Sequence, residues 1–279
     1  MGVATCDMKS CYAKSIKFGI ARAGPMQDAF SMLSDATGLN GTGVSKPVPL
    51  FYRTLMASLP PVVRSLTNVR YLGLDRLPRN GPVILAGNHT SHIDPIVVIM
   101  GARIPVRYLA KTEHFNGGFT KFVMLSTGQI DTNRESGGTE ALSSAVDVLS
   151  DDGWMGIFPE GTRSRHTSPP FLQKGKTGIA RLAAKFPHAS VVPICITGAR
   201  KFMEPGKARI RLFTPIEVEF GEPITFSQWL TSPGGFNLTE PEIIQIFDSK
   251  PEKIQLTMGK MYRSFTDQLM ATLKNMGAP

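Results

Sequence analysis

The sequence predicts an α/β fold in which a mixed, largely parallel β-sheet carries helices on both of its faces. Beyond residue 70, short apolar segments of strand length alternate with segments whose apolar residues recur at helical spacing, and this pattern favours a sheet covered on both sides. With 42% hydrophobic and 19% charged residues, the chain of 279 residues can bury a full core and is not disordered. No uninterrupted apolar stretch approaches the roughly 20 residues that cross a bilayer.

Strands are predicted at short, mostly apolar segments bounded by polar or turn-forming residues. The predicted buried strands are 83–86, 106–110, 154–158 and 191–196, and two further β-like runs are 209–213 and 216–220. Because α/β sheets bind ligands at the loops that follow their strands, three polar loops stand out as candidate sites. They are 88–94, 128–134 and 159–165.

Helices are predicted between these strands, where apolar residues lie three and four positions apart. Pro95 suits a first helical position, a helix over 142–149 ends before Gly153, and another helix covers 179–186. The closing helix carries one apolar stripe, which we interpret as core packing and not as a cofactor site. Its residues are Ile254, Met258, Met261, Phe265, Leu269 and Leu273.

The segment 50–66 is apolar at helical spacing and has Arg53 and Arg64 at its edges. Pro60 and Pro61 are predicted to break a helix there, because each ring clashes with the preceding turn. Two interpretations stay open. One is a short helix packed on the core, and the other is an interfacial helix whose apolar side dips into lipid.

By composition, the chain divides into an N-terminal extension, residues 1–45, and a domain over residues 46–279. The extension is rich in Gly, Ala and Ser, and its segment 14–22 has the pattern of a short basic amphipathic helix, which would lie on a membrane or serve in targeting. A loosely ordered extension is the alternative. Three cysteines are too few for a disulfide framework, which indicates a reducing compartment.

The charge balance is positive, with 31 Lys and Arg against 22 Asp and Glu and a formal net charge of +9. Such a balance favours a partner that carries phosphate: nucleic acid, anionic lipid or a phosphorylated small molecule. The basic residues form no stripe interleaved with aromatic residues and no nucleic-acid motif. We therefore expect no nucleic-acid partner.

His89 and Asp94 are the main catalytic candidates, in the loop that follows the first predicted strand. On a straight helix they would lie about 140° apart, but a turn from strand to helix lets the Asp94 carboxylate fold back onto imidazole Nδ1. Such a contact fixes the tautomer and leaves Nε2 free to remove a proton from a substrate hydroxyl. Backbone amides near Thr90 or Ser91 are candidate donors to the oxyanion of such a reaction.

This pair has two other interpretations. Taken alone, His89 is typical of a hydrogen-bonded loop histidine without a catalytic role. A metal site at His89, His92 and Asp94 is disfavoured, because the other three histidines form no ligand-like pair. We expect no metal and no cofactor.

Two later loops supply residues that suit a phosphate group. Arg134 closes the first of these loops, and Glu160, Gly161 and Arg163 lie in the second. The guanidinium fork suits bidentate phosphate binding, and a glycine lets backbone N–H groups approach an anion. We expect Glu160 to orient an arginine or a substrate hydroxyl, and Lys111 to add to the positive field. Taken singly, each arginine is more typical of a solvated surface residue.

Four short motifs follow one another along the chain. They are Asn88-His-x4-Asp94, Gly128-x-Ile-x3-Arg134, Phe158-Pro-Glu-Gly-Thr-Arg163 and Val191-Val-Pro-Ile194. In this order they resemble the four blocks of the glycerolipid acyltransferase family, which comprises glycerol-3-phosphate and 1-acylglycerol-3-phosphate acyltransferases. The resemblance covers residues 50–225, and the Thr-Ser pair after His89 is more similar to the enzymes that act on lysophosphatidate.

The resemblance implies a glycerol-3-phosphate acyltransferase-like fold and transfer of a fatty acyl group from acyl-CoA or acyl carrier protein. The implied acceptor is the sn-2 hydroxyl of 1-acylglycerol 3-phosphate (lysophosphatidic acid), and the product is phosphatidic acid. His89 is implied as the general base, and Asp94 as the residue that orients it. The residues of the implied phosphate site are Arg134, Glu160, Gly161, Arg163 and Lys111. The alternatives are glycerol 3-phosphate or another lysophospholipid as acceptor, or a non-enzymatic membrane-binding protein.

Two departures from the family pattern bear on these expectations. Cys195 stands in the fourth motif where another residue is expected, which weakens inferences about the wall of the acyl site. Residues 1–45 lack the strongly apolar span that many relatives carry. Membrane contact is therefore expected to be peripheral and on the cytoplasmic face, through 50–66 and the basic surface. Organellar targeting is compatible with the extension.

Overall fold

The computed structural model describes residues 25–132, 139–164, 166–206 and 209–279. Within these residues lies a seven-stranded sheet with the order β1-β7-β6-β2-β5-β3-β4. Neighbouring strands are parallel throughout except for β6 and β7, which are antiparallel. The predicted mixed, largely parallel sheet is thus confirmed. The strands are β1 Asn68–Leu72, β2 Val83–Gly87, β3 Val106–Lys111, β4 Ile130–Thr132, β5 Trp154–Ile157, β6 Ser190–Thr197 and β7 Pro215–Phe220.

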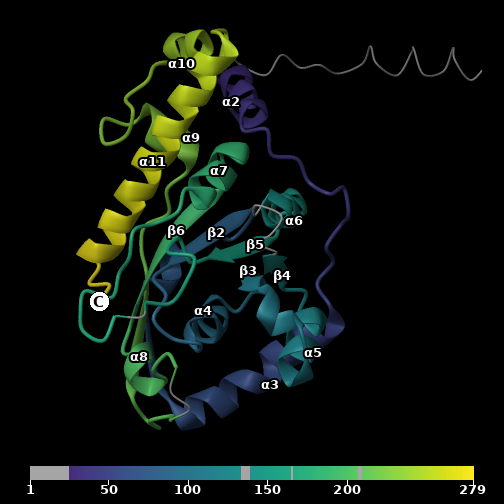
Figure 1. The fold of residues 1–279 in the computed structure, drawn as a ribbon, viewed down its shortest axis with the longest axis vertical. Coiled ribbons are helices and arrows are strands. Elements are labelled where there is room, and N and C mark those ends of the chain that lie inside the picture. The colour runs from purple at the N-terminus through teal and green to yellow at the C-terminus, as the bar shows by residue number, and fades with distance from the viewer. Residues whose placement is uncertain (1–24, 133–138, 165, 207–208) are drawn as a thin grey trace, which may run out of the picture.

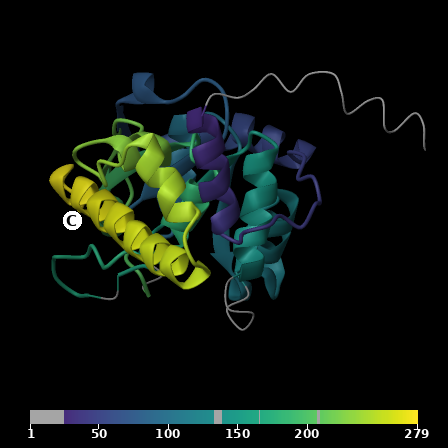
Figure 2. The ribbon, with the colours of Figure 1, turned by 90° about the horizontal axis from the view of Figure 1, so that it is seen from above.

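Helices cover both faces of this sheet, as the sequence predicts (Figure 1 and Figure 2). Successive residues of a strand point to opposite faces. In β2, Ile84 and Ala86 belong to one buried apolar cluster, and Val83 and Leu85 belong to the other. The first cluster is completed by α2 Pro25–Ala36, α6 Thr139–Ser150, α7 Gly178–Lys185, α9 Phe226–Thr231, α10 Glu240–Phe247 and α11 Pro251–Asn275. The second is completed by α3 Leu50–Leu66, α4 Asp94–Ala102 and α8 Ala199–Phe202.

The closing helix α11 lies along the first face with its apolar stripe turned inward. Met258, Met261 and Phe265 of the stripe are buried, as are Leu269 and Leu273. The interpretation of this stripe as core packing is therefore confirmed. Neither α11 nor any other helix in the described part of the chain is both long and apolar enough to cross a membrane.

Helix α3 runs without interruption through Pro60 and Pro61, so the predicted break is wrong. Each ring removes one N–H donor from the helix, but buried residues anchor the chain on both sides of the pair. Tyr52 and Val63 are buried, and the Tyr52 hydroxyl donates a hydrogen bond of 2.7 Å to the carbonyl of Val106. Packing at both ends keeps the helix continuous where local propensity does not.

The predicted β-like run over 209–213 is also wrong. Its contribution to pairing is an isolated bridge between Met203 and Ile210. The chain then turns at Phe213, whose φ of 58° lies outside the strand region. Ile210, Leu212 and Phe213 are all exposed. The alternation of apolar and basic residues therefore has no core behind it and does not produce a strand.

The described part of the N-terminal extension packs on the domain. Residues 1–24, with the predicted basic helix over 14–22, lie outside the described residues. Leu33 of α2 is fully buried in the first cluster. Further along, the hydroxyl of Thr42 donates a hydrogen bond to the Asp147 carboxylate of α6. Residues 25–45 are thus held by both apolar and polar contacts.

Candidate active site

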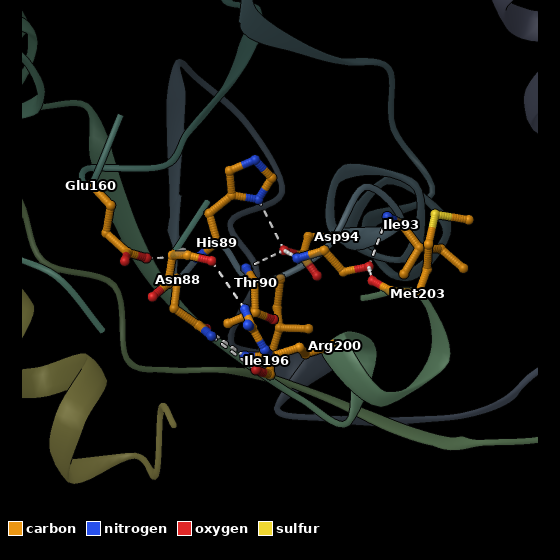
Figure 3. Close-up of polar contacts among 11 residues, drawn as sticks. Asn88, His89, Thr90, Ile93, Asp94, Glu160, Ile196, Arg200 and Met203 are labelled. Carbon is orange, nitrogen blue, oxygen red and sulfur yellow. Dashed lines mark hydrogen bonds and ion pairs between the residues drawn. The ribbon is translucent and has the colours of Figure 1, made fainter. Parts of the chain in front are cut away.

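The turn between β2 and α4 brings His89 and Asp94 into contact, as the strand-to-helix geometry predicts. Asp94 is the first residue of α4, and Pro95 follows it in the first turn of the helix. His89 Nδ1 lies 2.9 Å from Asp94 Oδ2 (Figure 3). The carboxylate only accepts hydrogen bonds, so in the neutral form of the imidazole the proton lies on Nδ1 and Nε2 is left as an acceptor.

The Asp94 carboxylate is the centre of the turn's hydrogen bonds. Its Oδ2 also accepts from the backbone N–H groups of Thr90 and Ser91, each at 2.7 Å. The side chain is fully buried, and its Oδ1 has no hydrogen-bond partner within the described structure. The expectation that these two amides stabilise an oxyanion is therefore wrong, because both already donate to Asp94.

Stacked aromatic rings set the plane of the His89 imidazole. The His89 and Phe158 rings lie 4.0 Å apart between centroids and 9° from parallel. Tyr108 of β3 stacks on Phe158 in turn, at 5.2 Å and 20°. This packing requires Gly156, because a Cβ at that position would lie 2.2 Å from the Tyr108 ring. The imidazole is thus fixed both by its ring contacts and by the Asp94 carboxylate.

Two further side chains anchor the turn to neighbouring strands. The Asn88 amide bonds both backbone groups of Ile196 on β6, accepting from its N–H at 2.7 Å and donating to its carbonyl at 2.9 Å. On the other side, Glu160 Oε1 accepts from the His89 N–H at 2.7 Å (Figure 3). Glu160 Oε2 accepts from the Gln173 N–H at 2.9 Å. These contacts join the turn to β6 and to the loop after β5.

Glu160 therefore holds the backbone of the turn rather than an arginine. Burial raises the pKa of its carboxyl group to about 7, against the opposing effect of the two N–H donors. The side chain is almost fully buried. Its expected part in a phosphate site stays a prediction, whereas its contact with the main chain of His89 is a feature that the motif did not predict.

A cavity of about 1560 Å³ opens in front of the imidazole. Four of the predicted site residues line it together: His89, Lys111, Gly161 and Arg163. Arg134 lies outside the described residues. Much of the remaining wall is apolar and comes from α3, α4 and α5 Gly118–Ser126. One cavity thus combines the candidate base, cationic groups and a long apolar wall.

Arg163 is the most informative of the cationic residues. Its Nη1 is buried and has no hydrogen-bond partner within the described structure. Burial lowers the pKa of the guanidinium, and the charge of Asp94 partly offsets that effect. A buried donor without a partner is costly, and an anionic ligand in the cavity would remove that cost.

Gly161 and Lys176 lie against each other at the same wall. Gly161 has a φ of 71°, and a Cβ there would lie 2.9 Å from the Nζ of Lys176. Both residues line the cavity, so the glycine allows a second cationic side chain to approach. Among the described residues, no group of three or more His, Cys, Asp and Glu side chains is arranged to hold a metal ion.

The fold and the site together define an α/β protein in which a His–Asp pair and a partly buried arginine line one cavity. Residues 68–197 match the model of the Acyltransferase family. The matched segment makes up just under half of the chain and contains both His89 and Arg163.

The similar proteins are 1-acyl-sn-glycerol-3-phosphate acyltransferases. The enzyme of Borreliella burgdorferi is 30% identical over 132 residues, which are 47% of this chain and 51% of that protein. The enzyme of Chlamydomonas reinhardtii is 30% identical over 142 residues, 50% of this chain and 41% of that protein. The match thus spans about half the length of these relatives. The crystal structure of the 1-acyl-sn-glycerophosphate acyltransferase of Thermotoga maritima aligns over 88% of each chain, with a TM-score of 0.47 and 17% identity.

Proposed function

We propose that this protein transfers a fatty acyl group from a thioester donor to the sn-2 hydroxyl of 1-acylglycerol 3-phosphate, which yields phosphatidic acid. The observation that carries the proposal is one cavity lined by both His89, which Asp94 orients, and Arg163, whose Nη1 has no hydrogen-bond partner among the described residues. The match of residues 68–197 to the Acyltransferase family and the similarity to 1-acyl-sn-glycerol-3-phosphate acyltransferases support the same reaction class.

In the proposed reaction, His89 Nε2 accepts the proton of the acceptor hydroxyl while that oxygen attacks the thioester carbonyl carbon. The tetrahedral intermediate then collapses, the carbon–sulfur bond breaks, and the leaving thiolate takes the proton back from the imidazolium. Asp94 accepts from Nδ1–H throughout and stabilises the imidazolium that forms. General base assistance of this kind contributes about 10²–10⁴ in rate.

Arg163 would bind the phosphate of the acceptor, with Gly161 and Lys111 in the same wall. The guanidinium offers a forked pair of donors that fits a phosphate group. Since Arg163 and His89 border one cavity, an acceptor whose phosphate and hydroxyl belong to one glycerol unit can meet both. The apolar wall from α3, α4 and α5 would take the acyl chains.

Membrane contact is proposed for the outer side of the same helices, which we name the α3–α5 face. Its exposed apolar residues are Leu50, Phe51, Val62, Leu66, Phe119, Phe122 and Leu125. Phe51 and Phe122 are in edge-to-face contact across the two helices, with ring centroids 5.2 Å apart. Contiguous exposed apolar residues are typical of interaction sites, and the exposed Arg53 and Lys121 beside them suit anionic lipid. The attachment is peripheral.

The proposed function is tested by the release of free thiol from acyl-CoA in the presence of candidate acceptors, with mass spectrometry of the lipid product. We expect release that depends on lysophosphatidic acid and gives phosphatidic acid acylated at sn-2. Release with glycerol 3-phosphate or another lysophospholipid in its place would redirect the proposal to that acceptor. No acceptor-dependent release would contradict an enzymatic function.

A further inference from the structure

The turn between β2 and α4 carries the candidate pair His89 and Asp94, and we name it the catalytic turn. A second, smaller cavity lies on its other side. Its volume is about 430 Å³, and none of its lining residues lines the large cavity. Thr90, the neighbour of His89, forms part of its wall, as does Gly198 at the end of β6. We name it the Arg200 cavity. The turn that carries the candidate base thus contributes Thr90 to this cavity and His89 to the large one.

The charge of the Arg200 cavity is strongly positive. Its described lining contains one acidic side chain, Glu204, and four cationic ones: Arg200, Lys201, Arg209 and Arg211. Lys201, Arg209 and Arg211 are exposed, so their charges reach the mouth of the cavity. Such a concave cationic site attracts polyanions.

Arg200 is held in place within this cavity. Its Nη1 donates to the carbonyl of Ser164 at 3.0 Å, and its Nη2 donates to the carbonyl of His166. The guanidinium carbon lies 4.2 Å from the centre of the Phe171 ring. Ser164 in turn donates its N–H to the His89 carbonyl. These contacts hold the Arg200 guanidinium in a defined position close to the catalytic turn.

We propose that the Arg200 cavity binds the phosphate groups of coenzyme A when acyl-CoA is the acyl donor. The proposal rests on the acyl transfer proposed above and assigns the donor to a separate site. Arg163 in the large cavity accounts for the phosphate of the acceptor, whereas the Arg200 cavity is a second cationic site that adjoins the same turn from the other side. A two-substrate reaction whose substrates both carry phosphate needs two such sites.

The size of the cavity favours a small polyanion over a carrier protein. Its volume of about 430 Å³ lies within the range of about 300–1,000 Å³ that small-molecule sites have. Docking of a carrier protein would instead need about 800 Å² of surface on each partner. Coenzyme A carries a pyrophosphate and a 3′-phosphate at one end of a long, flexible pantetheine arm, so its anionic end binds apart from its reacting thioester.

The test uses the variant Arg209→Gln/Arg211→Gln, which removes two exposed charges and leaves the His–Asp pair intact. We expect its KM for acyl-CoA to rise about tenfold or more, because each lost charge-assisted contact to phosphate weakens binding. The KM for lysophosphatidic acid should stay unchanged, and so should the rate with an S-acyl-pantetheine donor, which has no phosphate. The matched control, Lys253→Gln/Lys260→Gln, removes the same charge from exposed positions of α11 and should leave all three values unchanged.

Binding of free coenzyme A, measured by calorimetry without acceptor, separates this proposal from the proposed function. We expect the variant to raise the Kd for coenzyme A about tenfold, even if no acceptor supports turnover. An unchanged Kd and KM for the CoA forms would overturn the proposal. A rise in KM confined to acyl-ACP would assign the surface to the carrier protein, and loss of binding to vesicles of phosphatidylglycerol without a change for coenzyme A would assign it to lipid. Either result would contradict the proposal.

Discussion

The catalytic turn and the helices that carry the α3–α5 face line the same large cavity, but the turn and the face are built in opposite ways. Asp94 of the turn and Glu160, which contacts the turn from the loop after β5, are buried and together accept hydrogen bonds from five backbone or ring N–H groups. On the α3–α5 face, large apolar side chains are left exposed, and Phe119 is 79% exposed. The turn is constructed for fixed geometry, whereas the face is constructed for contact with something outside the chain. We therefore expect residues of the turn to control turnover and residues of the α3–α5 face to control membrane binding.

Asp94→Asn keeps the shape of the side chain, and among such substitutions we expect it to lower turnover the most. The amide keeps the size of the carboxylate but cannot stabilise the imidazolium or enforce the same tautomer. We expect kcat to fall by about 10²-fold or more, with KM for both substrates nearly constant in steady-state assays. A variant with wild-type kcat would show that Asp94 serves the fold alone.

Arg163→Ala is expected to act on acceptor binding. The KM for lysophosphatidic acid should rise about 10–100-fold, since a charge-assisted contact to phosphate is lost, while kcat changes little if ground and transition states lose it alike. A monoacylglycerol acceptor, which has no phosphate, should be used equally well by both proteins. If the KM of the donor rises instead, the acceptor phosphate does not lie at Arg163.

The variant Phe119→Ser/Phe122→Ser tests the α3–α5 face. Because both rings are exposed, the free energy of unfolding should change by no more than about 0.5 kcal/mol for each substitution. Cosedimentation with vesicles of phosphatidylcholine and phosphatidylglycerol should weaken about tenfold, through loss of buried apolar area in the lipid. The matched control is Leu256→Ser on α11, also exposed, at 62%, which should bind vesicles as the wild type does. Equal vesicle binding by all three proteins would contradict membrane contact through the α3–α5 face.

A smaller effect, on stability, is expected from Glu160. Its pKa is raised to about 7 in the folded protein, so between its ordinary pKa of 4.5 and about 7 the folded state binds the additional proton. The free energy of unfolding should therefore fall as the pH rises through this range, by at most about 3 kcal/mol from this group. Glu160→Gln cannot ionise, and urea unfolding at pH 5 and pH 8 should show a smaller difference for the variant. The same difference in both proteins would contradict the raised pKa.

The parts of the site that depend on local geometry could be predicted from the sequence. His89 and Asp94 are five residues apart, and a strand followed by a helix leaves few ways to join them, so their contact could be predicted. The alternating strands and the stripe of α11 were predictable for the same reason, because burial leaves a periodic pattern in the sequence.

The rest depends on contacts between distant segments. Two contacts of His89 depend on the packing of β5 beside β2. They are the stacking of the Phe158 ring on the imidazole and the hydrogen bond from the His89 N–H to Glu160. The continuity of α3 through its two prolines depends on the buried residues Tyr52 and Val63. Helix propensity alone does not predict it. Likewise, the Arg200 cavity joins residues near 90, 170 and 200, and no local pattern connects them.

The central claim is that His89 removes the proton from an acceptor that Arg163 holds by its phosphate. It is tested most directly by measuring turnover and lysophosphatidic acid binding on the same preparation of His89→Ala. We expect acceptor-dependent thiol release to fall by about 10²–10⁴-fold, with a Kd for the acceptor within twofold of the wild-type value. Substantial turnover in the variant would contradict the role of the imidazole as base, and loss of acceptor binding together with turnover would show that His89 holds the acceptor instead.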